Sequence, residues 1–124
     1  LKNIFENTKV KFKWCRLFYL YGKGEKETRL YPYVTNLLKN NKIVDIGKGD
    51  QVRDYLNIDE AAKKIIKFSF SLSSGVKNIC SGKPITLKNF VLKIAKKIKK
   101  NHLVKFTKKK ITRKFDPKFI VGVK

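Results

Sequence analysis

The chain has 124 residues, 42% of them hydrophobic, and its 31 basic and 9 acidic side chains give a formal net charge of +22. Nine Phe, five Tyr and one Trp exclude a disordered tail, which would be poor in aromatic residues. The sequence has neither the run of about 18 apolar residues that a membrane span needs nor a signal-peptide pattern at its start. The length fits one domain or a piece of one. The sequence contains no Met and stops just after an apolar stretch, so we expect it to be an internal fragment of a longer protein. The alternative is a domain trimmed at both ends.

The first half of the chain opens with an aromatic segment that predicts a buried strand. Alternating apolar positions become a continuous run that stops at Gly22, as in a strand covered on both faces of a parallel sheet. Farther along, Pro32 suits the first turn of a helix. The backbone N–H groups of that turn have no partner within the helix, so the N–H that proline lacks costs no hydrogen bond. In order, this half predicts a strand at 10–22, a polar loop at 22–29, a helix from about Pro32 to Asn40, a strand at 42–46, a glycine turn at 47–50 and an alternating strand at 52–58.

The second half predicts two amphipathic helices. Asp59 is expected to cap a helix from Glu60 to about Phe70, and Thr86 to cap a second, because their side-chain oxygens can accept first-turn N–H groups. A loop, a strand at 76–80 and a turn at 81–84 separate the helices, and 104–106 suggest a last strand. The expected inner stripes are Ala62, Ile65, Ile66 and Ser69 in the first helix, and Leu87, Phe90, Val91, Ile94, Ala95 and Ile98 in the second. The order of elements predicts a mixed α/β fold.

The high positive charge has two interpretations. Only four of the 31 basic residues are Arg, and this Lys-rich, Ile-rich, Asn-rich mixture is typical of an AT-rich coding sequence. Proteins that grip phosphate by planar bidentate contacts favour Arg, although a Lys coat still attracts nucleic acid non-specifically. The run Lys108-Lys109-Lys110 therefore indicates a solvated basic surface more readily than a nucleic-acid patch.

The sequence contains no pattern typical of a metal site or of a redox-active cysteine pair. Cys15 and Cys80 are too far apart for a zinc spacing, and His102 is the one histidine. We expect no metal site and two reduced thiols, as in a cytoplasmic protein.

Two patterns imitate catalytic motifs. Gly22-x-Gly24-x-x-Glu27, with Asp45 farther on, resembles a dinucleotide-binding turn, but a Glu at the third position blocks close packing and no helix is predicted to open there. Tyr19-x-x-x-Lys23 has the spacing of a catalytic Tyr–Lys pair. In an extended chain, however, residues four apart are roughly 13 Å apart, so we reject this pair.

The segment Gly47 to Asp59 is more informative. A glycine turn leads into a strand that carries Arg53, one of only four arginines. A guanidinium in this place can grip a pyrophosphate with two hydrogen bonds. It can equally well pair structurally with Asp54 or Asp59, and chemistry alone leaves both interpretations open.

Three segments in order resemble a known family. They are Arg16-Leu17-Phe18-Tyr19-Leu20-Tyr21-Gly22, then Gly49-Asp50-Gln51-Val52-Arg53-Asp54-Tyr55-Leu56 with Asp59, and Asn78-Ile79-Cys80-Ser81-Gly82-Lys83-Pro84-Ile85. They look like the C-terminal half of the NAD-dependent epimerase/dehydratase family, the extended short-chain dehydrogenases that act on nucleotide sugars. The resemblance covers residues 10–100 well, and the tail around Asp116-Pro117 and 119–122 weakly.

The resemblance implies roles for individual residues. Leu17 and Phe18 would lie near the nicotinamide end of the cofactor. Arg53 would bind the pyrophosphate of the nucleotide sugar, and Tyr55 would line the same cleft or pack beneath it. Tyr19 replaces the family's common Asn, which touches substrate phosphate or sugar. Asp59 and Asn78 would be structural.

The same resemblance implies the chain's place in a larger enzyme. Residues 1–22 would end in a late strand of the Rossmann sheet, and residues 23–124 would be mainly the substrate-binding lobe. The family's glycine-rich loop and catalytic Tyr–Lys pair would precede Leu1, so the chain itself has no catalytic residue and is expected to be inactive and marginally folded alone. The parent would use NAD or NADP to epimerise, dehydrate or reduce a nucleotide-linked sugar, as a homodimer, with no membrane or specific nucleic-acid partner.

Two other functions fit the sequence. A small basic nucleic-acid-binding module would use the lysine face of helix 86–100 and the run 105–114, with exposed aromatic rings for stacking. The aromatic residues lie in apolar runs rather than among the lysines, which disfavours this function. A degenerate family member retained as a scaffold is the other alternative.

Overall fold

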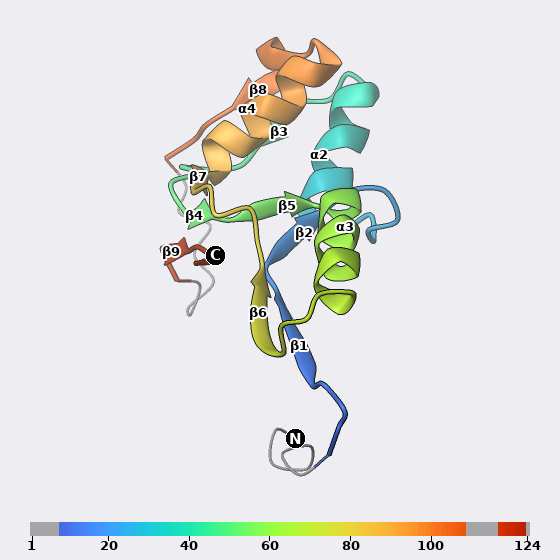
Figure 1. Ribbon diagram of the computed structural model, residues 1–124. Coiled ribbons are helices and arrows are strands. Elements are labelled where there is room, and N and C mark those ends of the chain that lie inside the picture. Colours follow the sequence, from blue (N-terminus) through green and yellow to red (C-terminus); the bar gives the residue numbers. More distant parts are fainter. Residues whose placement is uncertain (1–7, 109–116, 124) are drawn as a thin grey trace.

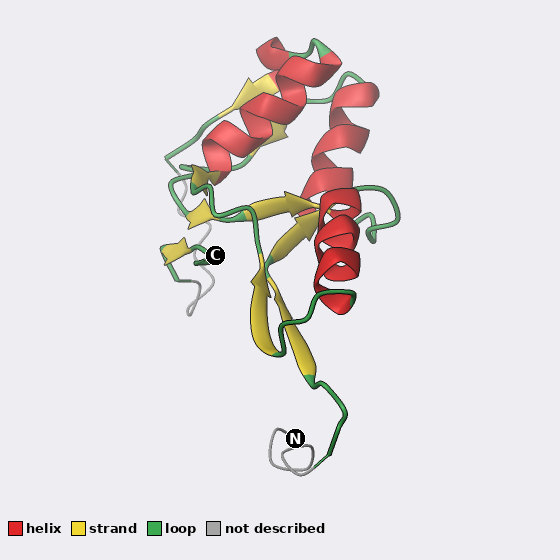
Figure 2. Ribbon diagram, in the orientation of Figure 1, coloured by secondary structure: helices red, strands yellow, loops and turns green. Residues whose placement is uncertain are grey.

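The computed structural model describes residues 8–108 and 117–123, which form a mixed α/β fold (Figures 1 and 2). Lys109, Lys110 and Asp116 of the segments singled out above lie outside these residues. No helix in the described part of the chain is both long and apolar enough to cross a membrane. The elements are β1 (Lys13–Leu17), β2 (Tyr19–Tyr21), α2 (Leu30–Lys39), β3 (Val44–Asp45), β4 (Val52–Arg53), β5 (Tyr55–Asn57), α3 (Ile58–Ser69), β6 (Gly75–Ile79), β7 (Ile85–Thr86), α4 (Leu87–Ile98), the 3-10 helix η1 (Asn101–Leu103), β8 (Val104–Lys105) and β9 (Phe119–Ile120).

The first aromatic segment forms parallel strands, as predicted, but it is divided at Phe18. β1 pairs in parallel with β6, and β2 pairs in parallel with β5. The prediction that both faces are buried is wrong for β1, where Trp14 and Leu17 are about half exposed. The physical reason is that the apolar cluster of α3 and β6 takes in only Cys15 from β1.

The helix after β5 begins earlier than predicted. Its N-cap is Asn57 rather than Asp59: the Asn57 Oδ1 atom accepts the Asp59 N–H at 2.9 Å. Asp59 instead lies in the first turn, where its charge favours the helix dipole.

The inner face of α3 also differs from the prediction. The buried side chains are Ala61 and Phe68, with Ile65 partly buried beside them, whereas Ala62, Ile66 and Ser69 are exposed. Apolar residues occupy adjoining stripes of this helix, so periodicity alone fits two faces. Packing against β5 and β6, through Leu56 and Ile79, selects one of them.

A lysine holds the end of α3 against β1. The Lys13 Nζ atom donates to the carbonyl oxygens of Phe68, Ser69 and Ser71 at 2.7, 2.7 and 2.6 Å. The last carbonyls of a helix have no N–H partner within the helix, so this ammonium group supplies a donor for Ser69 and Ser71 and adds one for Phe68, whose carbonyl also accepts from the Ser71 N–H and hydroxyl.

We expect Lys13→Met to lower the free energy of unfolding by about 2 kcal/mol, because charge-assisted hydrogen bonds are lost while the aliphatic stem is kept. Urea denaturation measures the loss. Lys93→Met on the exposed side of α4 is the control, and an equal loss in both variants would contradict the capping role.

Helices α2 and α4 pack together over the β3–β8 pair, as Figure 1 shows. The predicted cap of α4 is confirmed, because the Thr86 Oγ1 atom accepts the Asn89 N–H at 3.1 Å. The predicted stripe is confirmed too, with Leu87 and Ile98 partly buried at its ends. The buried side chains of this core are Val34, Leu38, Val44, Ile46, Phe90, Val91, Ile94 and Ala95.

The predicted strand 52–58 is two strands, β4 and β5, separated by Asp54. β4 lies between antiparallel β7 and parallel β9. The chain breaks at Asp54 because this fully buried carboxylate accepts the Ser81 and Gly82 N–H groups, both at 2.7 Å. The break ties β4 to the turn that follows β6.

Candidate functional site

Arg53 lies in the middle strand of the β7-β4-β9 sheet, opposite Ile85 on one side and Ile120 on the other. Only 3% of this residue is exposed. Its Nη1 atom donates to the Val52 carbonyl at 2.8 Å, and the guanidinium carbon lies 5.3 Å from the centre of the Tyr19 ring. The structure therefore brings Arg53 to the end of the first aromatic segment.

Asp54, the acidic residue next to Arg53 in the sequence, has partners of its own. The Asp54 carboxylate is bound by two backbone N–H groups of the 81–84 turn, and Asp59 lies in the first turn of α3. The Asp54 arrangement is one that the sequence pattern does not indicate, because the partners are 27 and 28 residues away.

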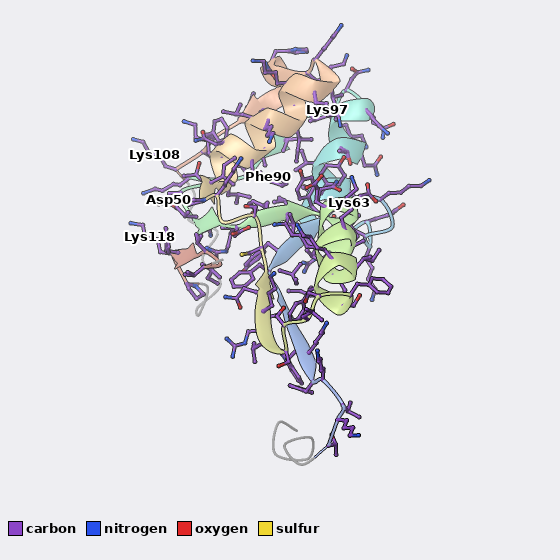
Figure 3. The ribbon with its side chains drawn as sticks, in the orientation of Figure 1. Asp50, Lys63, Phe90, Lys97, Lys108 and Lys118 are labelled. Atoms are coloured by element: carbon purple, nitrogen blue, oxygen red, sulfur yellow. The ribbon has the colours of Figure 1, made fainter. Side chains whose placement is uncertain are left out.

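A cavity of about 420 Å³ has Tyr19 in its wall, and the ring of the same Tyr19 lies against the Arg53 guanidinium, although Arg53 is not among the lining residues. The Tyr55 ring stacks on Phe90 with 3.8 Å between centroids and an angle of 8° between planes, and Tyr21 meets Phe90 edge-on at 4.9 Å. Phe90 is buried, and Figure 3 shows it on α4, with Lys108 and Lys118 at the edge of the molecule. The residues that line the cavity are Tyr19, Leu20, Tyr21, Glu25, Thr28, Arg29, Leu30, Tyr31, Tyr55 and Phe90.

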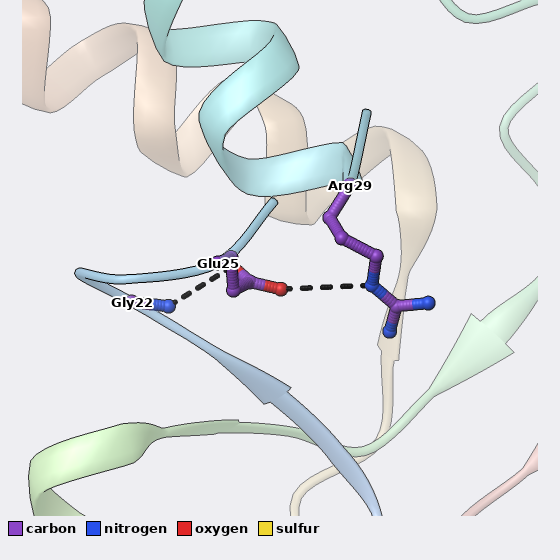
Figure 4. A network of polar contacts seen from close by, with 3 residues as sticks. All are labelled: Gly22, Glu25 and Arg29. Atoms are coloured by element: carbon purple, nitrogen blue, oxygen red, sulfur yellow. Dashed lines mark hydrogen bonds and ion pairs between the residues drawn. The ribbon is translucent and has the colours of Figure 1, made fainter. Parts of the chain in front are cut away.

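An ion pair shapes the loop at this cavity (Figure 4). The Gly22 N–H donates to Glu25 Oε2 at 3.1 Å, and Glu25 Oε1 lies 3.8 Å from Arg29 Nε. Gly22 has φ +152°, and a Cβ there would lie 2.6 Å from Ile58 Cγ2, so only glycine fits. The loop therefore sets both a negative and a positive group on the cavity wall.

Tyr21 is an ionisable group of the cavity wall whose environment is perturbed. Burial raises the pKa of the Tyr21 phenol, and the nearby Tyr31 and Glu60 raise that pKa further. Tyr21 is therefore neutral at pH 7 and can donate a hydrogen bond to a ligand, but it does not serve as a base.

The two residues expected near a cofactor lie where β1 ends. Leu17 is 53% exposed, and the Phe18 ring faces the C-terminal segment. Gly122 packs against Phe18 and the buried Cys80, leaving no space for a side chain at that position. Asn78 holds this segment by donating its side-chain N–H to the Val123 carbonyl at 2.9 Å.

Sequence reasoning predicts Tyr19, Arg53 and Tyr55, which the structure gathers in one region, with Leu17 and Phe18 at the strand end nearby. It misses the other eight residues of the cavity wall, among them Phe90, Tyr31, Glu25 and Arg29. Phe90 and Tyr31 have the helical spacing of ordinary core residues, so nothing in the pattern separates them. Glu25 and Arg29 lie in the predicted polar loop 22–29, where no helical spacing brings residues four apart together, so the sequence gives no signal for their ion pair.

Comparisons with known proteins agree with the three-segment resemblance. A model described as the NAD dependent epimerase/dehydratase family matches residues 1–80. CDP-abequose synthase from Salmonella muenchen is 35% identical over 95 residues, which cover 74% of this chain and 32% of that enzyme. The chain thus spans about a third of the length of this curated relative.

Solved structures share the fold at low sequence identity. UDP-N-acetylglucosamine 4-epimerase from Methanobrevibacter ruminantium, in complex with UDP-N-acetylmuramic acid, has a TM-score of 0.85 and 23% identity, over 98% of this chain and 40% of that one. UDP-glucose 4-epimerase from Thermus thermophilus, in complex with NAD, has a TM-score of 0.72 and 20% identity, over 90% of this chain and 38% of that one. The fold is that of part of an extended short-chain dehydrogenase.

Proposed function

Because this chain belongs to the NAD-dependent epimerase/dehydratase family, we propose that it is the substrate-binding portion of an enzyme that acts on a nucleotide-linked sugar. The reaction would be an NAD(P)-dependent epimerisation, dehydration or reduction. The observation that carries the proposal is the buried Arg53 guanidinium over the Tyr19 ring. In this proposal, residues 1–22 end in a late strand of the nucleotide-binding sheet and residues 23–124 are mainly the substrate lobe.

Arg53 would bind the diphosphate of the nucleotide. A planar guanidinium matches two phosphate oxygens, and low exposure strengthens the attraction because water competes less. The Tyr19 ring beneath it favours a cation at that place and limits how the guanidinium can turn. Tyr19 would therefore act as a positioning residue for Arg53, in place of the polar contact that the family's Asn makes.

The aromatic cavity would hold a ring-shaped part of the substrate next to the diphosphate. Tyr19 and Tyr55 belong to its wall, together with the ion pair of Glu25 and Arg29. Aromatic faces pack against the apolar faces of sugars and bases, while charged groups select hydroxyl or carbonyl oxygens. This composition supports a nucleotide-linked sugar over a purely apolar ligand.

Leu17 and Phe18 fit one apolar side of a nicotinamide site. They lie at the carboxyl end of β1, the edge at which open parallel sheets bind ligands, and Leu17 exposes apolar surface there. NAD or NADP supplies hydride transfer when it is bound. The family's glycine-rich loop and Tyr–Lys pair have no counterpart in this chain, and we propose that a longer, homodimeric parent supplies them.

Calorimetric titration with UDP and CDP, the nucleotides in the names of the relatives, tests the proposal. We expect the purified protein to bind these diphosphates more tightly than uridine or cytidine. The 124-residue chain alone is expected to show neither turnover nor NAD binding. Equal affinity for nucleosides and diphosphates would contradict the role of Arg53, and turnover by the chain alone would contradict its description as a substrate-binding portion. Binding of single-stranded DNA that survives raised salt would favour the nucleic-acid-binding alternative.

A further inference from the structure

The end of α3 exposes large apolar side chains. Leu72 and Phe70 are 89% and 86% exposed, and Ile66, one turn before Phe70, is 57% exposed. These three residues are called the α3 tip below. Side chains this accessible protrude into solvent and do not line a groove, and clustered exposed apolar residues commonly mark an interaction site.

The flanks of the α3 tip are basic. Lys63 and Lys67 each lie three residues before a tip residue on the helix, at Ile66 and Phe70, and are exposed. The Lys11 Nζ atom donates to the Leu72 carbonyl at 3.4 Å, which places a third ammonium group beside the tip. The segments 8–19 and 61–80, which build this end of the molecule, contain no Asp or Glu.

The α3 tip lies away from the candidate functional site. Lys13 and Gly75 are in register at the amino ends of the parallel strands β1 and β6, and the tip precedes Gly75. The cavity instead is lined by β2, the loop that follows it, Tyr55 of β5 and Phe90 of α4. In Figure 1 this end of α3 points away from α2 and α4. A partner at the tip therefore leaves the cavity open.

We propose that the α3 tip attaches the protein to the surface of a bilayer that contains anionic lipids. Phe70, Leu72 and Ile66 would enter the boundary between headgroups and acyl chains, and Lys11, Lys63 and Lys67 would contact the lipid phosphates. A bilayer suits this surface because protruding apolar residues need a deformable apolar phase, and the all-positive flanks need negative charge. The sequence analysis predicts no membrane partner because no segment can span a bilayer, but surface attachment needs no span.

Co-sedimentation of the purified protein with phosphatidylcholine vesicles, with and without phosphatidylglycerol, tests this inference. We expect binding to the anionic vesicles only. Phe70→Ser/Leu72→Ser should reduce the partition coefficient onto these vesicles at least roughly tenfold. The control Ile43→Ser, at an exposed apolar residue between α2 and β3, should leave it unchanged. Circular dichroism verifies that each variant keeps its fold.

A pair of lysine variants separates the tip from the general lysine coat. Lys63→Gln/Lys67→Gln should weaken vesicle binding several-fold more than Lys96→Gln/Lys97→Gln on the exposed side of α4. Equal effects of the two pairs, full binding by the serine variant, or no binding to anionic vesicles would each overturn the proposal. So would a dimer, seen by sedimentation, that the serine variant converts to monomer while vesicle binding is unchanged. This inference rests on the α3 tip staying exposed in the longer parent proposed above, and the titration with diphosphates tests the proposed function in a separate experiment.

Discussion

Replacing Asp54 by Ala should lower the free energy of unfolding by about 3 kcal/mol. The buried carboxylate accepts two backbone N–H groups at 2.7 Å, so the substitution removes two charge-assisted hydrogen bonds and leaves both donors, of Ser81 and Gly82, without this acceptor. It also frees β4 from the turn after β6. Urea or thermal denaturation, followed by circular dichroism, measures the loss.

The Asp54 prediction has two matched controls. Asp50→Ala, at an exposed position in the turn before β4, should change stability by no more than a few tenths of a kcal/mol. Asp54→Asn keeps the shape but replaces the charged oxygens with one neutral acceptor, so its loss should be intermediate. A change of under about 1 kcal/mol in Asp54→Ala would show that the carboxylate does not hold the two segments together.

Arg53→Gln should weaken binding of UDP or CDP roughly 100-fold, about 2.7 kcal/mol, while affinity for uridine or cytidine stays within a factor of about two. The reason is that glutamine has neither the charge nor the forked donors that two phosphate oxygens need. Arg53→Lys keeps the charge and should weaken diphosphate binding roughly tenfold, which separates geometry from charge. Isothermal titration calorimetry measures each affinity.

The exposed Arg16 of β1 supplies the control for this prediction, because Arg16→Lys should leave diphosphate affinity unchanged. Tyr19 supplies a second test. Tyr19→Phe keeps the ring beneath Arg53 and should bind diphosphate almost as well as the wild type. Tyr19→Ala removes the ring, and its affinity for diphosphate should be roughly tenfold lower. Equal affinities in these two variants would remove the positioning role of Tyr19.

The sequence predicts those parts of the fold that local patterns determine. α4 has a threonine cap and a single apolar stripe, and both are confirmed. α3 offers two adjoining apolar stripes, so only its packing against β5 and β6 decides which residues are buried. The break at Asp54 and the pairing of β4 with β9 depend on residues far along the chain, which no local pattern reveals.

The candidate site also combines residues that the sequence could predict with features that it could not. Arg53, Tyr19 and Tyr55 could be chosen from the family resemblance, because short ordered segments carry it. The burial of Arg53 could not, because it is a property of the folded chain, in which β4 lies between the distant strands β7 and β9. Phe90 enters the cavity from α4, and its spacing in the sequence is that of any core residue.

A crystal structure of the protein with UDP or CDP bound tests the central claim most directly. The account predicts diphosphate oxygens within hydrogen-bond distance of the Arg53 guanidinium, with the Tyr19 ring beneath it and the remainder of the ligand in the aromatic cavity. A diphosphate bound elsewhere, with Arg53 making no contact to it, would contradict the account.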